Sequence, residues 1–177
     1  MNKRPLFEDY QKAFDFHAEG LLRDIYVFNT SEADWQMVID DLRSNTAYPI
    51  RFLLDQKPQP LPHEVKAIFH LTQDHAVLLR IDEGQLNLHC YFFTPDQIEF
   101  DLDPRDIQND DRLVRLLDFI HHIGNLLQKP VVLTPESVET IHYLSFDPKT
   151  GKDEWSLPEW SAPRKVQMKN TKFQREK

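Results

Sequence analysis

The sequence contains little of the material from which common functional sites are built. Of its 177 residues only one is a cysteine, Cys90, and only four are glycines. A single cysteine excludes an internal disulfide and any zinc site made of several cysteines. Few glycines leave little material for a phosphate-binding loop, and the Gly-x-Ser-x-Gly and His-Glu-x-x-His motifs are missing. The sequence therefore predicts no metal and no cofactor, and it favours a protein that is not an enzyme.

Long hydrophobic runs are missing as well. No apolar stretch approaches the roughly 20 residues of a membrane-spanning helix, and the segment MNKRPLFEDYQK lacks the apolar stretch of a secretory signal. These features predict a cytoplasmic protein with no membrane partner. The hydrophobic content of 40% is ordinary for a globular protein. We expect one globular domain at 1–155, followed by a basic, proline-interrupted tail at 156–177.

Acidic residues outnumber basic ones, but unevenly along the chain. The 29 Asp and Glu residues against 21 Lys and Arg residues give a net charge of −8. Residues 161–177 hold six basic residues and one acidic residue, so residues 1–160 carry a net charge of −13. An acidic body repels phosphate groups and attracts basic proteins. We therefore expect a basic protein as the partner, and nucleic acid only through the basic tail.

Hydrophobic periodicity predicts helices and strands in alternation around a run of three strands. Apolar residues three and four positions apart indicate helices, and alternating or β-branched runs indicate strands. The expected order is helix 7–19, strand 23–29, helix 30–45, strand 48–54, a short helix from Pro62, strands 76–82, 85–93 and 98–103, helix 109–127, and strands 130–136 and 140–151. This order predicts the α+β class, with a mixed, largely antiparallel sheet and helices packed on one face. The sheet contains a three-stranded meander at 76–103.

The register of this meander follows from the requirement that its apolar residues share one face. A slip of one residue would move every side chain to the opposite face. A two-residue turn at Glu83–Gly84 and a three-residue loop at 95–97 both give one continuous apolar face. The expected apolar pairs are Ile81 with Leu86, Leu79 with Leu88, Val77 with Cys90, Cys90 with Leu102, and Phe92 with Phe100. Cys90 is then a buried structural thiol rather than a nucleophile.

The opposite face of the meander carries the candidate site. It combines aromatic rings and carboxylates beside one histidine: His89, Tyr91, Phe93, Glu99, Asp101 and Asp103. The expected cross-strand pairs are His89 with Asp103, Tyr91 with Asp101, and Phe93 with Glu99. The two or three carboxylates that can converge here offer fewer oxygens than a hard cation requires, so no metal site is predicted.

Three interpretations of this face remain open. The first is a solvated sheet surface with a weak His–Asp pair. The second is a protein-binding face, in which aromatic side chains anchor a basic partner and carboxylates steer it. The third is a small hydrolase that uses His89 and Asp103 as an acid–base pair, with or without a divalent ion. A different class, a structural subunit whose basic tail contacts nucleic acid, also remains open.

The protein-binding interpretation is the one that we carry forward. The overall profile is that of a small, acidic protein with few motifs and a mixed sheet. It is similar in type to bacterial immunity or antitoxin-type inhibitors, which neutralise basic toxic enzymes by surface binding. This resemblance implies a non-enzymatic inhibitor that docks a basic partner through the acidic, aromatic face of its meander.

Overall fold

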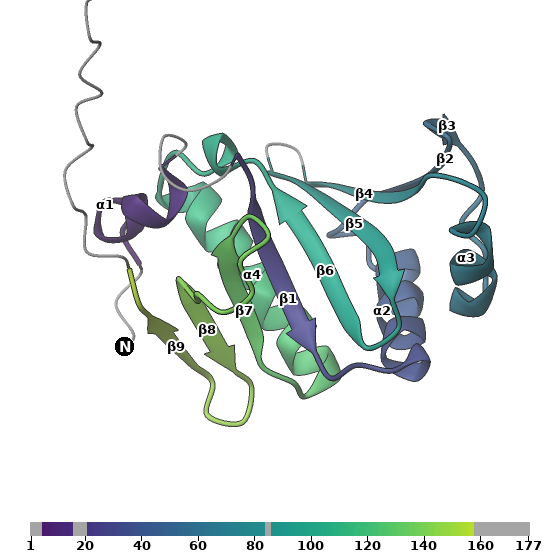
Figure 1. The fold of residues 1–177 in the computed structure, drawn as a ribbon. Coiled ribbons are helices and arrows are strands. Elements are labelled where there is room, and N and C mark those ends of the chain that lie inside the picture. Colours follow the sequence, from purple (N-terminus) through teal and green to yellow (C-terminus); the bar gives the residue numbers. More distant parts are fainter. Residues whose placement is uncertain (1–4, 16–20, 84–85, 158–177) are drawn as a thin grey trace, which may run out of the picture.

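An antiparallel sheet organises residues 5–15, 21–83 and 86–157, which are the residues that the computed structural model describes. Within them nine strands follow the order β3-β2-β4-β5-β6-β1-β7-β8-β9, and each neighbouring pair is antiparallel (Figure 1). The expected α+β class with a large antiparallel sheet is confirmed, and β4, β5 and β6 form the expected meander. No parallel pair, which a mixed sheet would include, occurs among these strands.

The bounds of the elements agree with most of the expected ranges. The strands are β1 Arg23–Phe28, β2 Ile50–Leu54, β3 Lys57–Pro58, β4 Val77–Glu83, β5 Leu86–Thr94, β6 Gln97–Leu102, β7 Val131–Pro135, β8 Leu144–Asp147 and β9 Lys152–Trp155. The helices are α1 Phe7–Tyr10, α2 Glu32–Ser44, α3 Val65–Leu71 and α4 Asp110–Leu127, with 3-10 turns η1 Gln11–Phe14 and η2 Pro104–Asp106.

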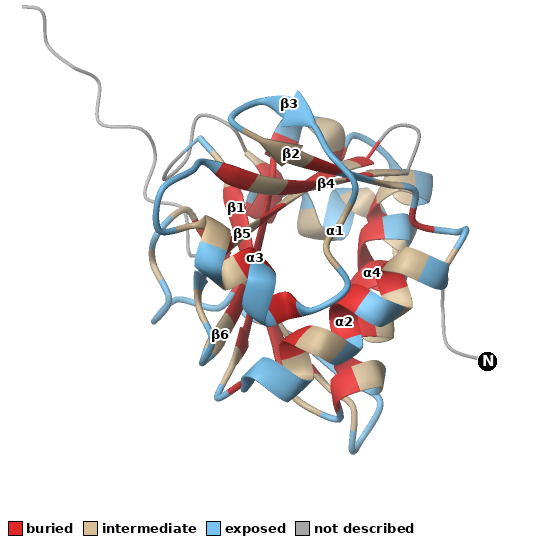
Figure 2. Ribbon diagram, turned by 90° about the vertical axis from the view of Figure 1, so that its right-hand side faces the viewer, coloured by how far each residue is buried: buried red, intermediate tan, exposed pale blue. Residues whose placement is uncertain are grey.

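The two long helices, α2 and α4, lie on the same face of the sheet (Figure 1). Each begins at a capping side chain that accepts a backbone N–H: Ser31 from Asp34 in α2, and Asn109 from Arg112 in α4. Figure 2 shows buried residues on the sides of α2 and α4 that face the sheet and exposed residues on their outer sides. This burial is what the apolar stripes of the two sequences predict.

Two segments differ from the expected elements. The helix expected at 7–19 is a single turn of α-helix followed by a 3-10 turn that ends at Phe14, and residues 16–19 lie outside the described residues. The strand expected at 140–151 is shorter, since β8 covers Leu144–Asp147; the chain then reverses in the expected turn at 148–151, where Gly151 has φ +64°, and continues into the unexpected strand β9. Most of the expected tail, from residue 158 onward, lies outside the described residues.

The meander has the expected faces but not the expected register. The first turn lies between Glu83 and Leu86, so Ile81 pairs with Leu88 rather than with Leu86. At the second turn the loop is two residues long, and a bulge between Tyr91 and Thr94 takes up one further residue of β5. Both pairings are displaced by two residues from the expected ones. A displacement of two preserves the alternation of side chains, which is why every residue stays on its expected face.

A fully buried arginine joins the N-terminal segment to the sheet. The guanidinium of Arg23 donates hydrogen bonds to the backbone carbonyls of Ala13 (2.5 Å), Leu22 (2.6 Å) and Asp15 (2.7 Å). Burial lowers the pKa of Arg23 from its ordinary value, since it disfavours the charged form. These bonds offset part of the cost of removing the cation from water.

Replacing Arg23 with Met should lower the free energy of unfolding by about 2–4 kcal/mol, because one buried and two partly buried carbonyls lose a donor. Urea denaturation followed by circular dichroism measures this change. Arg105→Met is the control, since Arg105 is exposed and its loss should change the stability much less. Equal losses for the two variants would contradict the structural role of Arg23.

Candidate functional site

The candidate functional site is the face of the central strands that α2 and α4 leave uncovered. We call it the open face. In β5 the side chains of Leu88, Cys90 and Phe92 are buried against the helical layer. The alternate residues point the other way: His89 and Tyr91 are half-buried, and Phe93 is 68% exposed. The expected assignment of faces is therefore confirmed for β5.

A row of charged side chains crosses the open face. Arg80 of β4 pairs with His89, His89 pairs with Asp101 of β6, and Asp101 pairs with Asp24 of β1. The Nδ1 atom of His89 lies 3.1 Å from Oδ1 of Asp101. The row changes from a guanidinium group, that of Arg80 on β4, to carboxylates on β6 and β1. It brings together residues that are far apart in the sequence, Asp24 and Asp101 among them.

The cross-strand pairs expected for the site do not form. His89 lies opposite Asp101 instead of Asp103, and Tyr91 lies opposite Glu99 instead of Asp101. Phe93 falls within the irregular stretch of β5 and has no partner at Glu99. The two-residue displacement of the register explains all three differences.

Asp103 is bound locally and takes no part in a pair with His89. Its carboxylate accepts hydrogen bonds from Nε (2.9 Å) and Nη2 (2.5 Å) of Arg105 and caps η2. The side-chain hydrogen bond from Arg105 lowers the pKa of Asp103. The acid–base pair on which the hydrolase interpretation depends is consequently not assembled. Cys90 offers no nucleophile either, since it lies in the core, where burial raises the pKa of its thiol well above the ordinary value.

Two carboxylates are buried at the edge of the open face, Asp24 (3% exposed) and Asp101 (6% exposed). Figure 1 shows the loop between β7 and β8 passing over β1. The backbone N–H of Ser137 in this loop donates to Oδ2 of Asp24 (2.6 Å), which also accepts from the hydroxyl of Tyr26 (3.0 Å). Asp101 lies beside Asp24 as its cross-strand partner. Asp101, one of the expected docking residues, is therefore not on the accessible surface.

The carboxylates of this region repel one another. Burial is the main cause that raises the pKa of Glu99 to about 7, and the charges of Asp24 and Asp101 raise it further. Burial also raises the pKa of Asp24. Glu99 is consequently close to half-protonated at neutral pH, which reduces the negative charge that the open face presents.

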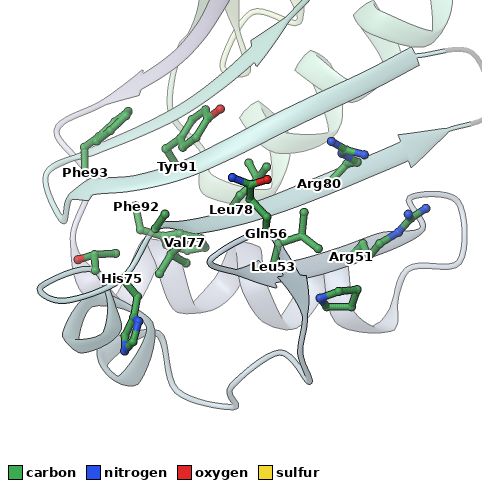
Figure 3. A pocket seen from close by; sticks show the side chains of 13 residues that line it. Arg51, Leu53, Gln56, His75, Val77, Leu78, Arg80, Tyr91, Phe92 and Phe93 are labelled. Atoms are coloured by element: carbon green, nitrogen blue, oxygen red, sulfur yellow. The ribbon is translucent and has the colours of Figure 1, made fainter.

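A groove of about 800 Å³ lies beside the aromatic residues of the open face. Figure 3 shows its walls: Tyr91 and Phe93 project from β5, while Arg51 and Leu53 come from β2. The rings of Tyr91 and Phe93 are stacked, with their centroids 5.4 Å apart. Arg51 and Arg80 are direct cross-strand partners, so two guanidinium groups line one groove. The site is therefore aromatic and cationic on this side, which the acidic composition did not indicate.

The two groove arginines differ in how far the sequence predicts their positions. The alternation of the meander places Arg80 on the open face, as expected from the sequence, although Arg80 was not among the expected site residues. Arg51 belongs to the preceding strand, and its proximity to Arg80 depends on the pairing of β2 with β4, which no local pattern reveals.

Within the described ranges, no group of three or more His, Cys, Asp or Glu residues is arranged to hold a metal ion, and no helix of that part of the chain could cross a membrane. No family model, curated protein or solved structure matches the chain.

The raised pKa of Glu99 predicts a stability that falls as pH increases. Between pH 4.5 and about 7 the unfolded chain releases the Glu99 proton and the folded protein retains it, so the free energy of unfolding decreases across this window. Glu99→Gln removes this loss. At about pH 8 the variant should be more stable than the parent by about 1–2 kcal/mol, allowing for screening at a half-buried site.

Urea denaturation at a series of pH values tests this prediction. Near pH 4.5 the variant and the parent should have similar stabilities, because Glu99 is protonated in the folded protein. Glu154→Gln, at an exposed position in β9, is the control and should leave the pH dependence unchanged. A pH dependence that is identical in the Glu99 variant and the parent would rule out the shift.

Proposed function

We propose that the protein is a non-enzymatic binding protein that inhibits a basic partner protein by covering part of its surface. The observation that carries this proposal is an aromatic pair beside a groove on the open face, in which the half-buried Tyr91 is stacked on the exposed Phe93. Large aromatic side chains at the edge of a concavity are typical anchors of protein interfaces. A phenylalanine that is 68% exposed also leaves apolar area in water that a partner would bury.

The charge of the chain supports a basic partner. Residues 1–160 carry a net charge of −13, and such a field accelerates association with a cationic protein. Glu99 lies on the open face, and Glu139 lies in the loop beside it and is exposed. In this proposal, these groups contact basic side chains of the partner around the aromatic anchor.

The docking set proposed here is smaller than the one expected from the sequence. His89, Tyr91, Phe93 and Glu99 have accessible surface, whereas Asp101 is buried and Asp103 is held by Arg105. We propose the bacterial immunity or antitoxin type of inhibitor as the class, on the basis of size, acidity and the lack of catalytic motifs. A cytoplasmic location is part of this proposal, and a single unpaired cysteine is typical of a reducing compartment.

The double variant Tyr91→Ser, Phe93→Ser should weaken the binding of the partner about 100-fold or more, because each ring supplies anchor energy at the centre of the interface. The partner is first captured from the source cells with the purified parent protein, then purified, and its Kd is measured by calorimetry. Denaturation curves confirm that the variant is folded.

Met37→Ser is the matched control, since Met37 is also an exposed apolar residue (46%) but lies on α2, in the helical layer. It should leave the Kd unchanged. The association rate of the parent should fall as salt increases, as expected for electrostatic steering. An unchanged Kd for the double variant, or a partner without net positive charge, would refute the proposal.

A further inference from the structure

Arg80, a partly buried arginine in the groove, has a buried nitrogen without a hydrogen-bond partner. The Nε atom of Arg80 is buried without a hydrogen bond, and no hydrogen bond or ion pair joins Arg80 to any described residue. Arg43 makes a useful comparison, because its Nε is also unbonded but its terminal nitrogens contact Pro62 O (2.7 Å) and Nδ1 of His63 (2.6 Å). A buried donor left without a partner is costly and calls for an explanation.

A second arginine in the groove, Arg51, adds positive charge that an anion would neutralise. Arg51 lies directly across the β2–β4 pair from Arg80, and like charges in opposing positions repel each other. Its nearest carboxylate oxygen, Oδ2 of Asp82, is 3.7 Å away, and both side chains are largely exposed. Such an ion pair contributes little. An anion between the two guanidinium groups would satisfy both of them, since arginine binds carboxylates through paired N–H donors.

Most of the remaining lining of the groove is apolar or aromatic, and Gln56, Thr72 and His75 are its other polar residues. Leu53, Leu78 and Pro58 line it together with the stacked rings of Tyr91 and Phe93 (Figure 3). Its volume of about 800 Å³ lies within the range of sites that hold small ligands or a few side chains. A suitable occupant therefore combines one negative group with adjacent apolar surface.

We infer that the groove binds a segment of the partner polypeptide in which an acidic side chain stands next to an aromatic or apolar one. The carboxylate lies between Arg51 and Arg80, and the apolar side chain packs against Leu78, Tyr91 and Phe93. This inference rests on the proposed function, because the groove belongs to the same open face.

Charge distinguishes this occupant from a nucleic acid and also orients the partner. A chain with a net charge of −8 repels a polyanion, but it tolerates a single carboxylate placed between two arginines. Across the open face, the cationic groove accepts the acidic segment, and the side that carries Glu99 meets basic residues of the same partner. This polarity allows one orientation of docking and disfavours the reverse.

The test uses two capped pentapeptides, Gly-Phe-Glu-Phe-Gly and the same peptide with Gln in place of Glu. In an NMR titration the Glu peptide should bind with a Kd of about 1 mM and shift the amide signals of Arg51, Arg80 and Tyr91. The Gln peptide should bind about tenfold more weakly, because it lacks the charge-assisted hydrogen bonds. Arg80→Gln should remove the difference between the peptides, and Arg115→Gln, an exposed arginine on α4, should preserve it.

Three results would overturn the inference: equal binding of the two peptides, no shifts in the groove up to about 10 mM peptide, or tighter binding of a short oligothymidylate than of the Glu peptide. The result of the peptide titration can be told apart from the result of the partner-binding test. If the peptides fail while the Tyr91, Phe93 variant loses the partner, the groove inference is wrong and the proposed function stands. If the peptides bind as expected but the partner is retained by that variant, the proposed function is wrong.

Discussion

The packing of α2 and α4 on only one face of the sheet is the constraint on which the rest of the structure depends. On the covered face, aromatic side chains of the helices pack against those of the sheet. The ring centroids of Trp35 and Phe92 lie 4.9 Å apart, and those of Phe119 and Phe100 lie 5.1 Å apart. Because strand residues alternate between faces, fixing Phe92 inward directs its neighbours outward. The exposure of Phe93 therefore follows from the burial of Phe92.

The open face has one half with carboxylates and one half with arginines. On one half Asp24 and Asp101 are buried, Asp24 beneath the β7–β8 loop, and burial together with mutual repulsion raises the pKa values of Asp24 and Glu99. On the other half Arg51 and Arg80 line the groove; Arg51 has only an exposed ion pair with Asp82, and the buried Nε of Arg80 has no hydrogen bond among the described residues. His89, bound to Asp101, stands between the halves. A surface of this kind favours a partner that presents charges of both signs in a fixed order.

The sequence predicted the fold class, the long helices and the faces of the meander, because these depend on local periodicity. The register was wrong, since a displacement of two residues keeps Leu88 and Phe92 on the covered face and periodicity cannot detect it. The burial of Asp101 was missed for a different reason. Asp101 lies beside Asp24, and only the long-range pairing of β1 with β6 brings these two carboxylates together. The same limit applies to Arg51, whose contact with Arg80 is set by long-range strand pairing.

The central claim is that the partner docks on the open face beside Phe93, and site-specific photo-crosslinking tests it most directly. A photoreactive benzoylphenylalanine is introduced at position 93 or, separately, at position 37 on the helical layer, and the source cells are irradiated. Docking on the open face predicts a covalent adduct with a basic protein from position 93 and none from position 37. An adduct from position 37 without one from position 93 would contradict it.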